Sequence, residues 1–128
     1  MFSEIVLEHF QRPRNAGELP GATAVVEVSN PVCGDLLRLA VVVEGGVVRD
    51  ARFLCRGCAA AIASSSLLTE KIKAKQLTEL KETTAEQIAA ELGGLPPASF
   101  HAAQLAEDAL RALVGRASSG TNLTREPS

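Results

Sequence analysis

The chain has 128 residues, of which 46% are hydrophobic, 22% charged and 3% aromatic, and its formal net charge is −2. This length fits one compact domain and excludes a second full one, while the composition is that of a folded globular protein. A chain with no basic excess and only four phenylalanines as aromatic residues is a poor nucleic-acid binder.

The N-terminal segment predicts a short helix over residues 3–11, which Pro13 stops. Ser3 is a suitable N-cap because its hydroxyl can accept a hydrogen bond from a first-turn amide. Helical spacing places four residues near one face, which are Ile5, Val6, His9 and Phe10. We expect this face to pack against the rest of the domain.

Three runs rich in β-branched residues, 24–28, 36–43 and 47–54, predict a small antiparallel sheet. Gly45-Gly46 is typical of a two-residue hairpin turn between the last two runs. Alternation along the third run places Ala51, Phe53 and Cys55 on one side, which we expect to face the core.

The spacing of apolar residues becomes helical after Gly57 and stays so to about Lys75. The residues spaced to pack inward are Ile62, Leu67 and Leu68. The run Ser64-Ser65-Ser66 resembles catalytic serines only in isolation, because no general base is within sequence reach. Within a helix that packs on a sheet, we interpret these serines as small residues that permit close approach.

Two further helices are predicted towards the C-terminus. Thr83 and Glu86 have the spacing of a capping box, which predicts a short helix that ends near residues 92–93. Pro96-Pro97 forces an extended loop, and Ser99 can cap a final helix. The inward stripe of that helix is Leu105, Ala109 and Leu113, and Glu107-Asp108 is interpreted as its solvated face.

A helix, three strands and then helices predict an α+β domain, with helices packed over one face of a small antiparallel sheet. We expect this single domain to span residues 1–116 and to be followed by a mobile polar tail, residues 117–128. Apolar runs such as residues 39–43 are far shorter than the roughly 20 residues that cross a bilayer, so no membrane contact is expected. The N-terminus also lacks a secretory pattern, so a cytoplasmic location is expected.

Three cysteines, Cys33, Cys55 and Cys58, need an explanation. In a reducing compartment such thiols serve packing, metal binding or chemistry more often than a disulfide framework. Cys33 lies in the loop sequence NPVCGD, and Cys58 lies where the third strand gives way to a helix. His101, near the start of the last helix, could complete a site of soft nitrogen and sulfur ligands, and Asp35 is a further candidate ligand.

Four stretches in this order resemble the IscU/NifU family of iron–sulfur cluster assembly scaffolds. They are SEIVLEHFQRPRNAG, NPVCGD, DARFLCRGCAAAIASSSLLTE and LPPASFHAAQLAEDAL, and they span about residues 2–115. The resemblance implies a three-stranded antiparallel sheet covered by helices, the IscU/SufE-like fold, in agreement with the segments above.

The resemblance also implies a site in which three cysteines, an aspartate and a histidine gather at one end of the domain. It assigns the first two cysteines to Cys33 and Cys58, the aspartate to Asp35 and the histidine to His101. The third cysteine of the family, a cluster ligand and sulfur acceptor, would directly follow His101, but Ala102 stands there.

Cys55 is an additional cysteine, three residues before Cys58, so the total remains three. A Cys-x-x-Cys pair can chelate one metal, so Cys55 is a possible replacement ligand or sulfur acceptor. Because Cys55 is predicted to lie on the core side of the strand, a role as a small core residue is favoured instead.

Each of the other candidates also has an ordinary structural interpretation. Cys33 can be a turn residue, and Asp35 can satisfy the amides of an exposed turn. His101 can cap its helix or form a local hydrogen bond.

The resemblance implies a binding protein rather than an enzyme, one that accepts iron and persulfide sulfur, holds a labile [2Fe–2S] cluster and transfers it to recipient apoproteins. The implied sulfur donor is a cysteine desulfurase. Zinc suits the same ligands in the cluster-free form. Docking on an Hsp70-type chaperone has less support, because LPPAS lacks the valine and lysine that usually follow LPP; a homo-oligomer is possible.

Two other functions compete with the scaffold. One is a thiol–disulfide oxidoreductase that uses Cys55 and Cys58, although such domains need βαβ crossovers, which a hairpin before Cys55 does not supply. The other is a regulator that binds the desulfurase without carrying a cluster, for which Ala102 is the main argument.

Overall fold

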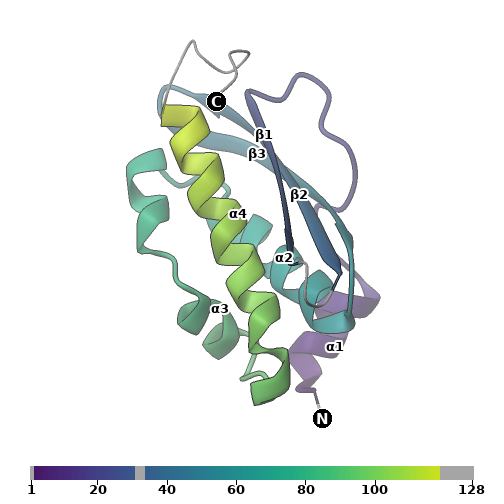
Figure 1. Ribbon diagram of the computed structural model, residues 1–128. Helices are drawn as coiled ribbons and strands as arrows, with labels where there is room; N and C mark the ends of the chain where they lie inside the picture. The colour runs from purple at the N-terminus through teal and green to yellow at the C-terminus, as the bar shows by residue number, and fades with distance from the viewer. Residues whose placement is uncertain (1, 31–33, 119–128) are drawn as a thin grey trace.

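The computed structural model describes residues 2–30 and 34–118, and it confirms the predicted α+β architecture (Figure 1). The elements in chain order are α1 (Glu4–Gln11), β1 (Ala24–Asn30), β2 (Asp35–Glu44), β3 (Val47–Arg56), α2 (Ala59–Ile72), the 3-10 helix η1 (Leu77–Glu82), α3 (Ala85–Glu91), the 3-10 turn η2 (Pro97–Ser99) and α4 (Phe100–Ser118).

The three strands form one antiparallel sheet in the order β1-β2-β3. Both glycines of the β2–β3 turn have positive φ, 61° for Gly45 and 78° for Gly46, the backbone that matches a tight hairpin to the twist of its strands. The register aligns Val26, Leu39 and Phe53 across the sheet, and all three are buried. These side chains therefore form the core face, as alternation predicts.

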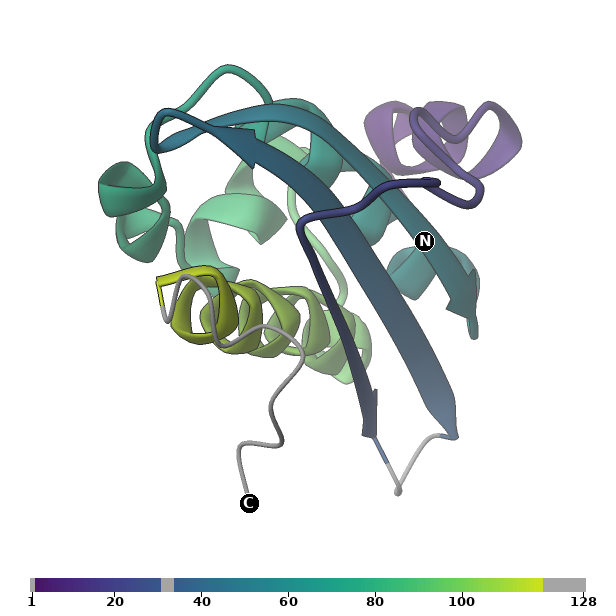
Figure 2. The same cartoon turned by 90° about the horizontal axis from the view of Figure 1, so that it is seen from above.

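The helices α2 and α4 cover this core face (Figure 2), while residues 17–19 lie over part of the opposite face. Leu68 of α2 and Leu110 of α4 are 0% and 1% exposed, and the predicted stripe of α4 is buried as well. The core consists mainly of valine, leucine, isoleucine and alanine. Within the described ranges, no helix is both long and apolar enough to cross a membrane.

Only two of the four residues predicted on the packing face of α1 are buried. Val6 and His9 are buried, but Ile5 and Phe10 are 44% and 41% exposed. The reason is that α1 packs mainly on α2, so that a single neighbouring helix covers only a narrow stripe of it.

The free edge of β3 is covered by backbone from two other segments. Phe53 donates an N–H to the carbonyl of Asn15 at 2.9 Å and accepts one from Gly17 at 2.8 Å. Val48 donates its N–H to the carbonyl of Lys75 at 2.9 Å. Because Lys75 lies along β3 in this way, α2 ends at Ile72 and not at the predicted Lys75. These contacts satisfy backbone groups that an edge strand otherwise exposes.

Two predicted caps are displaced. The capping box of α3 uses Thr84 and Gln87, one residue later than predicted, because Thr83 closes η1, a 3-10 helix that the sequence pattern did not indicate. Ser99 is the last residue of η2, which runs directly into α4, and so it does not stand outside the helical segment as a cap.

Candidate metal centre

Three of the predicted ligands lie together although they are far apart in the sequence. One ligand atom each from Asp35, Cys58 and His101 lies within 4.8 Å of the other two. Oδ2 of Asp35 is 3.8 Å from Sγ of Cys58 and 3.6 Å from Nε2 of His101. This convergence of groups that bind metals is the main chemical feature of this end of the domain.

Each of the three side chains is placed by the start of a different element. Asp35 is the first residue of β2, Cys58 holds the N-cap position of α2, and His101 is the second residue of α4. The Cys58 side chain makes no capping hydrogen bond, and Cys58 is exposed. The Cys58 thiol is therefore accessible to a metal ion from solvent.

Asp35 is buried, with 3% of its surface exposed, so the prediction of an exposed turn carboxylate is wrong. The carboxyl group fits against the backbone of Gly57, where a Cβ would lie only 2.5 Å from Oδ1 of Asp35. A buried carboxylate requires polar neighbours: among the described residues, Sγ of Cys58 donates to Oδ2 of Asp35, and Nε2 of His101 lies beside the same oxygen.

The hydrogen bond of His101 selects the ring nitrogen that faces the site. Nδ1 lies 3.0 Å from the carbonyl oxygen of Ala98, which can only accept, so Nδ1 carries the proton. In the neutral ring, Nε2 then offers its lone pair towards Asp35. The predicted local hydrogen bond and the predicted ligand role therefore use different nitrogens. Once Cys58 loses its proton, three electron-pair donors face one another, an arrangement that a cation stabilises.

Cys33, the other predicted cysteine ligand, lies outside the described residues, and its role stays a prediction. Of the predicted tail, residues 117–128, the structure describes only residues 117 and 118, which are the last two residues of α4.

Cys55 lies on the core side of β3, half-buried, as alternation predicts. Burial is the main reason that the pKa of its thiol rises to about 11; a hydrogen bond with Ser65 opposes this rise, and the neighbouring Asp35 and Cys58 add to it. The neutral thiol is thus the prevailing form near neutral pH, and it is neither the nucleophile nor the metal ligand.

Ala102 is also buried, at 1% exposure, and lies in a small cluster with Ala60 and Ala61. Cys55 packs against this same cluster. Ala102, where the family resemblance implies a third thiol, and Cys55 therefore pack in the same small cluster.

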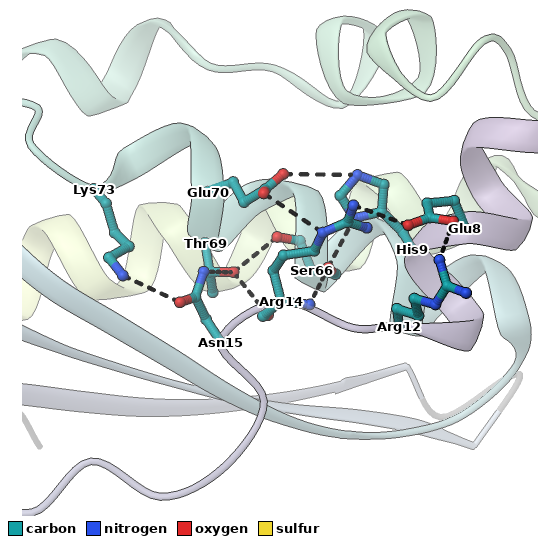
Figure 3. A network of polar contacts seen from close by, with 9 residues as sticks. All are labelled: Glu8, His9, Arg12, Arg14, Asn15, Ser66, Thr69, Glu70 and Lys73. Atoms are coloured by element: carbon teal, nitrogen blue, oxygen red, sulfur yellow. Dashed lines mark hydrogen bonds and ion pairs between the residues drawn. The ribbon is translucent and has the colours of Figure 1, made fainter.

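A polar network that the sequence pattern did not indicate joins α1 and the following loop to α2 (Figure 3). The hydroxyl of Ser66 accepts the Arg14 N–H at 2.8 Å and lies 2.8 Å from Nδ1 of His9, while Glu70 lies 3.7 Å from Nε2 of His9. A serine, a histidine and a carboxylate in line resemble a hydrolase triad, but Ser66 is 0% exposed, so no substrate reaches it. All three serines, 64–66, are buried, in agreement with a packing role.

Glu107 also differs from its prediction as a solvated residue, since its side chain is 13% exposed. It accepts the N–H of Ala85 at 2.7 Å and the Nε–H of Arg111 at 2.7 Å. Burial alone would raise the pKa of this carboxyl, but these two partners hold it below its ordinary value. Glu107 thereby fixes the start of α3 to α4.

The chain as a whole is similar to proteins that are already known. The family described as NifU-like N-terminal domain matches residues 1–119. The chain is 45% identical over 114 residues to "Iron-sulfur cluster assembly scaffold protein IscU 1" of Archaeoglobus fulgidus, which covers 89% of this chain and 74% of that protein. It is 44% identical over 117 residues to the scaffold protein IscU of Azotobacter vinelandii, covering 88% and 91% of the two chains.

Solved structures agree on the fold. A NifU-like N-terminal domain from Brucella abortus matches with a TM-score of 0.62 and 25% identity, covering 95% of this chain and 85% of that one. A protein from Fervidobacterium islandicum AW-1, described as a candidate iron–sulfur cluster assembly scaffold for the SUF system, matches with a TM-score of 0.74 and 22% identity over 88% and 96%.

Proposed function

Because the chain belongs to the family of NifU-like N-terminal domains, we propose that it is an iron–sulfur cluster assembly scaffold, as its IscU relatives are named. In this proposal the protein accepts iron and persulfide sulfur from a cysteine desulfurase, holds a labile [2Fe–2S] cluster and passes it to recipient apoproteins. Its residues bind and release this cargo, and none is assigned a catalytic role.

The observation that carries the proposal is the convergence of Asp35, Cys58 and His101 within 4.8 Å. Together with Cys33 they make a set of two thiolates, one carboxylate and one imidazole. Thiolates bind iron strongly, whereas carboxylate and imidazole are weaker ligands that exchange more readily. Such a mixed set suits a cluster that must be released.

The absence of a third thiol at position 102 determines how firmly this site can hold its cargo. Cys55 is half-buried on the core side of β3 and packs against the apolar core, so we assign it to packing rather than to the ligand set. With two thiolates instead of three, the cluster is expected to transfer or decay more readily.

Zinc is a second occupant that the same side chains favour, because a tetrahedral site of thiolate and imidazole ligands suits it well. We assign zinc to the cluster-free form only. Iron and zinc would then compete for Cys58 and His101, so added zinc should slow the assembly of a cluster.

Anaerobic reconstitution with ferrous iron, cysteine, a cysteine desulfurase and a dithiol reductant, which supplies the remaining electrons that convert persulfide sulfur to sulfide, tests the proposal. Expected are the absorption of a [2Fe–2S] cluster and equal amounts of bound iron and sulfide. Cys58→Ser should abolish loading, and Cys55→Ser is the matched control that should retain it. The IscU of Azotobacter vinelandii, loaded in parallel, shows that the reagents work.

Failure to load iron and sulfide while that relative loads would contradict the scaffold proposal. Binding to the desulfurase without loading would then favour a regulator that carries no cluster, which the buried Ala102 makes the second candidate.

A further inference from the structure

The two edges of the sheet are treated differently. Residues 15–17 and 74–76 cover the free edge of β3 with backbone contacts. Across the part of the chain that the structure describes, β1 pairs with β2 alone, so its other edge has no strand partner. The seven residues of β1 include neither proline nor lysine, the residues that commonly protect such an edge.

A hollow of about 300 Å³ adjoins this edge. Its walls are Ser29 and Asn30 at the end of β1 and His101, Gln104, Leu105 and Asp108 of α4. Figure 1 shows α4 running beside the sheet, and α4 is in contact with β1. An open strand edge beside a helix is the arrangement by which some domains bind extended peptides, with backbone hydrogen bonds to the strand and side chains in the groove.

The charges at this edge favour a basic occupant. Asp108 lines the hollow and is exposed, and Glu27 is exposed on β1. Neither carboxylate belongs to an ion pair with another described residue, although Arg38 lies opposite Glu27 on β2. A lysine or arginine on an added strand would meet Glu27 at cross-strand distance, and one on the groove side would face Asp108 of α4. A second copy of this chain would bring like charges together and is disfavoured.

We propose that β1 and the adjoining groove bind an extended, basic segment of a partner protein as an added strand. Its side chains alternate between the groove, where a cation meets Asp108, and the opposite face of the sheet beside Glu27. Because His101 forms part of the groove, the bound segment lies next to the candidate metal centre. Binding of this segment does not depend on whether the protein carries a cluster.

The test uses the full, cluster-free chain labelled with ¹⁵N and a blocked peptide as long as β1, 7 residues, of valines with two adjacent lysines at its centre, so that one lysine lies on each face of the strand. Expected are chemical-shift changes concentrated in residues 24–30 and 101–108. Asp108→Lys should weaken binding by about tenfold or more. Glu86→Lys, on the exposed surface of α3, changes the net charge equally and should bind as the original chain does.

Three results would overturn the proposal. One is the absence of shifts in both segments, and another is equal binding by a peptide with glutamate in place of lysine. The third is a concentration-dependent shift of β1 without peptide, which would assign the edge to a second copy. Because no iron or sulfur is present, none of these results bears on cluster loading.

Discussion

Gly57 touches Asp35 so closely that a side chain at position 57 would displace the carboxyl group. The Cβ of an alanine there would lie 2.5 Å from Oδ1 and 2.8 Å from Cγ of Asp35. Real Cβ atoms do not approach other atoms so closely, so the carboxyl group or the backbone must move. The glycine in Cys-x-Gly-Cys therefore has a role in shaping the metal centre.

Gly57→Ala is expected to weaken metal binding, because it moves Asp35 away from Cys58 and His101. Titration with Co²⁺, whose absorption reports thiolate ligation, measures the effect. Gly115→Ala is the matched control: in α4, no described atom outside its own stretch of helix lies within 4 Å of the added Cβ, and the change should stabilise the protein by about 0.5–1 kcal/mol. Unchanged Co²⁺ affinity in Gly57→Ala would contradict a ligand role for Asp35.

Two neighbouring serines of α2 should respond oppositely to alanine. Ser66→Ala removes the acceptor of the Arg14 N–H and the partner of His9, which should cost about 1–3 kcal/mol. Ser64 has a buried Oγ without a hydrogen-bond partner among the described residues, so Ser64→Ala should be neutral or stabilising. Urea unfolding of the two variants provides the comparison, and equal losses would mean that the network in Figure 3 contributes nothing specific.

The stability of the protein should fall in mild acid because of His9. Burial, assisted by the positive charge of Arg14, lowers the pKa of His9 below 6.5, although Glu70 and Glu8 oppose this. The unfolded chain therefore binds the proton more readily. The contribution of His9 is fully present above 6.5 and is lost as the pH falls below 6.5 through the folded-state pKa.

His9→Asn isolates this contribution, because the asparagine amide can replace Nδ1 towards Ser66 but does not titrate. Free energies of unfolding at about pH 7.5 and about pH 5.5 should differ less in the variant than in the original chain. Each unit of pKa shift corresponds to about 1.4 kcal/mol. The same pH dependence in both proteins would assign the acid sensitivity to other groups.

The lifetime of a bound cluster should depend on whether residue 102 is a cysteine, and not on Cys55. Ala102→Cys places a thiol beside His101 and should lengthen the lifetime of a reconstituted cluster. Cys55→Ser should cost about 1 kcal/mol of stability, since it places a polar hydroxyl in a half-buried site, and leave loading intact. A loss of loading in Cys55→Ser would mean that this thiol leaves the core to serve as a ligand.

The local pattern of the sequence was sufficient for the sheet and for the direction of Cys55, because alternation along β3 is a property of the strand itself. It was insufficient for Asp35, whose burial depends on Gly57, a residue that the fold brings beside it from the end of β3. The exposure of Phe10 likewise depends on which single helix α1 meets. Residue chemistry alone named Cys58, His101 and Asp35 as candidate ligands, but spacing does not bring His101 to Cys58, and the family resemblance was needed to expect that they gather at one end of the domain.

The attachment of α1 determines the order in which the molecule opens. A helix of 8 residues is unstable alone, and α1 contributes one fully buried apolar side chain, Val6, to the core. Polar contacts of His9, and of Arg14 in the loop after α1, also join this region to α2. Amide hydrogens of α1 should therefore exchange with solvent well before those of β2, through a sub-global opening that leaves the sheet and α4 intact.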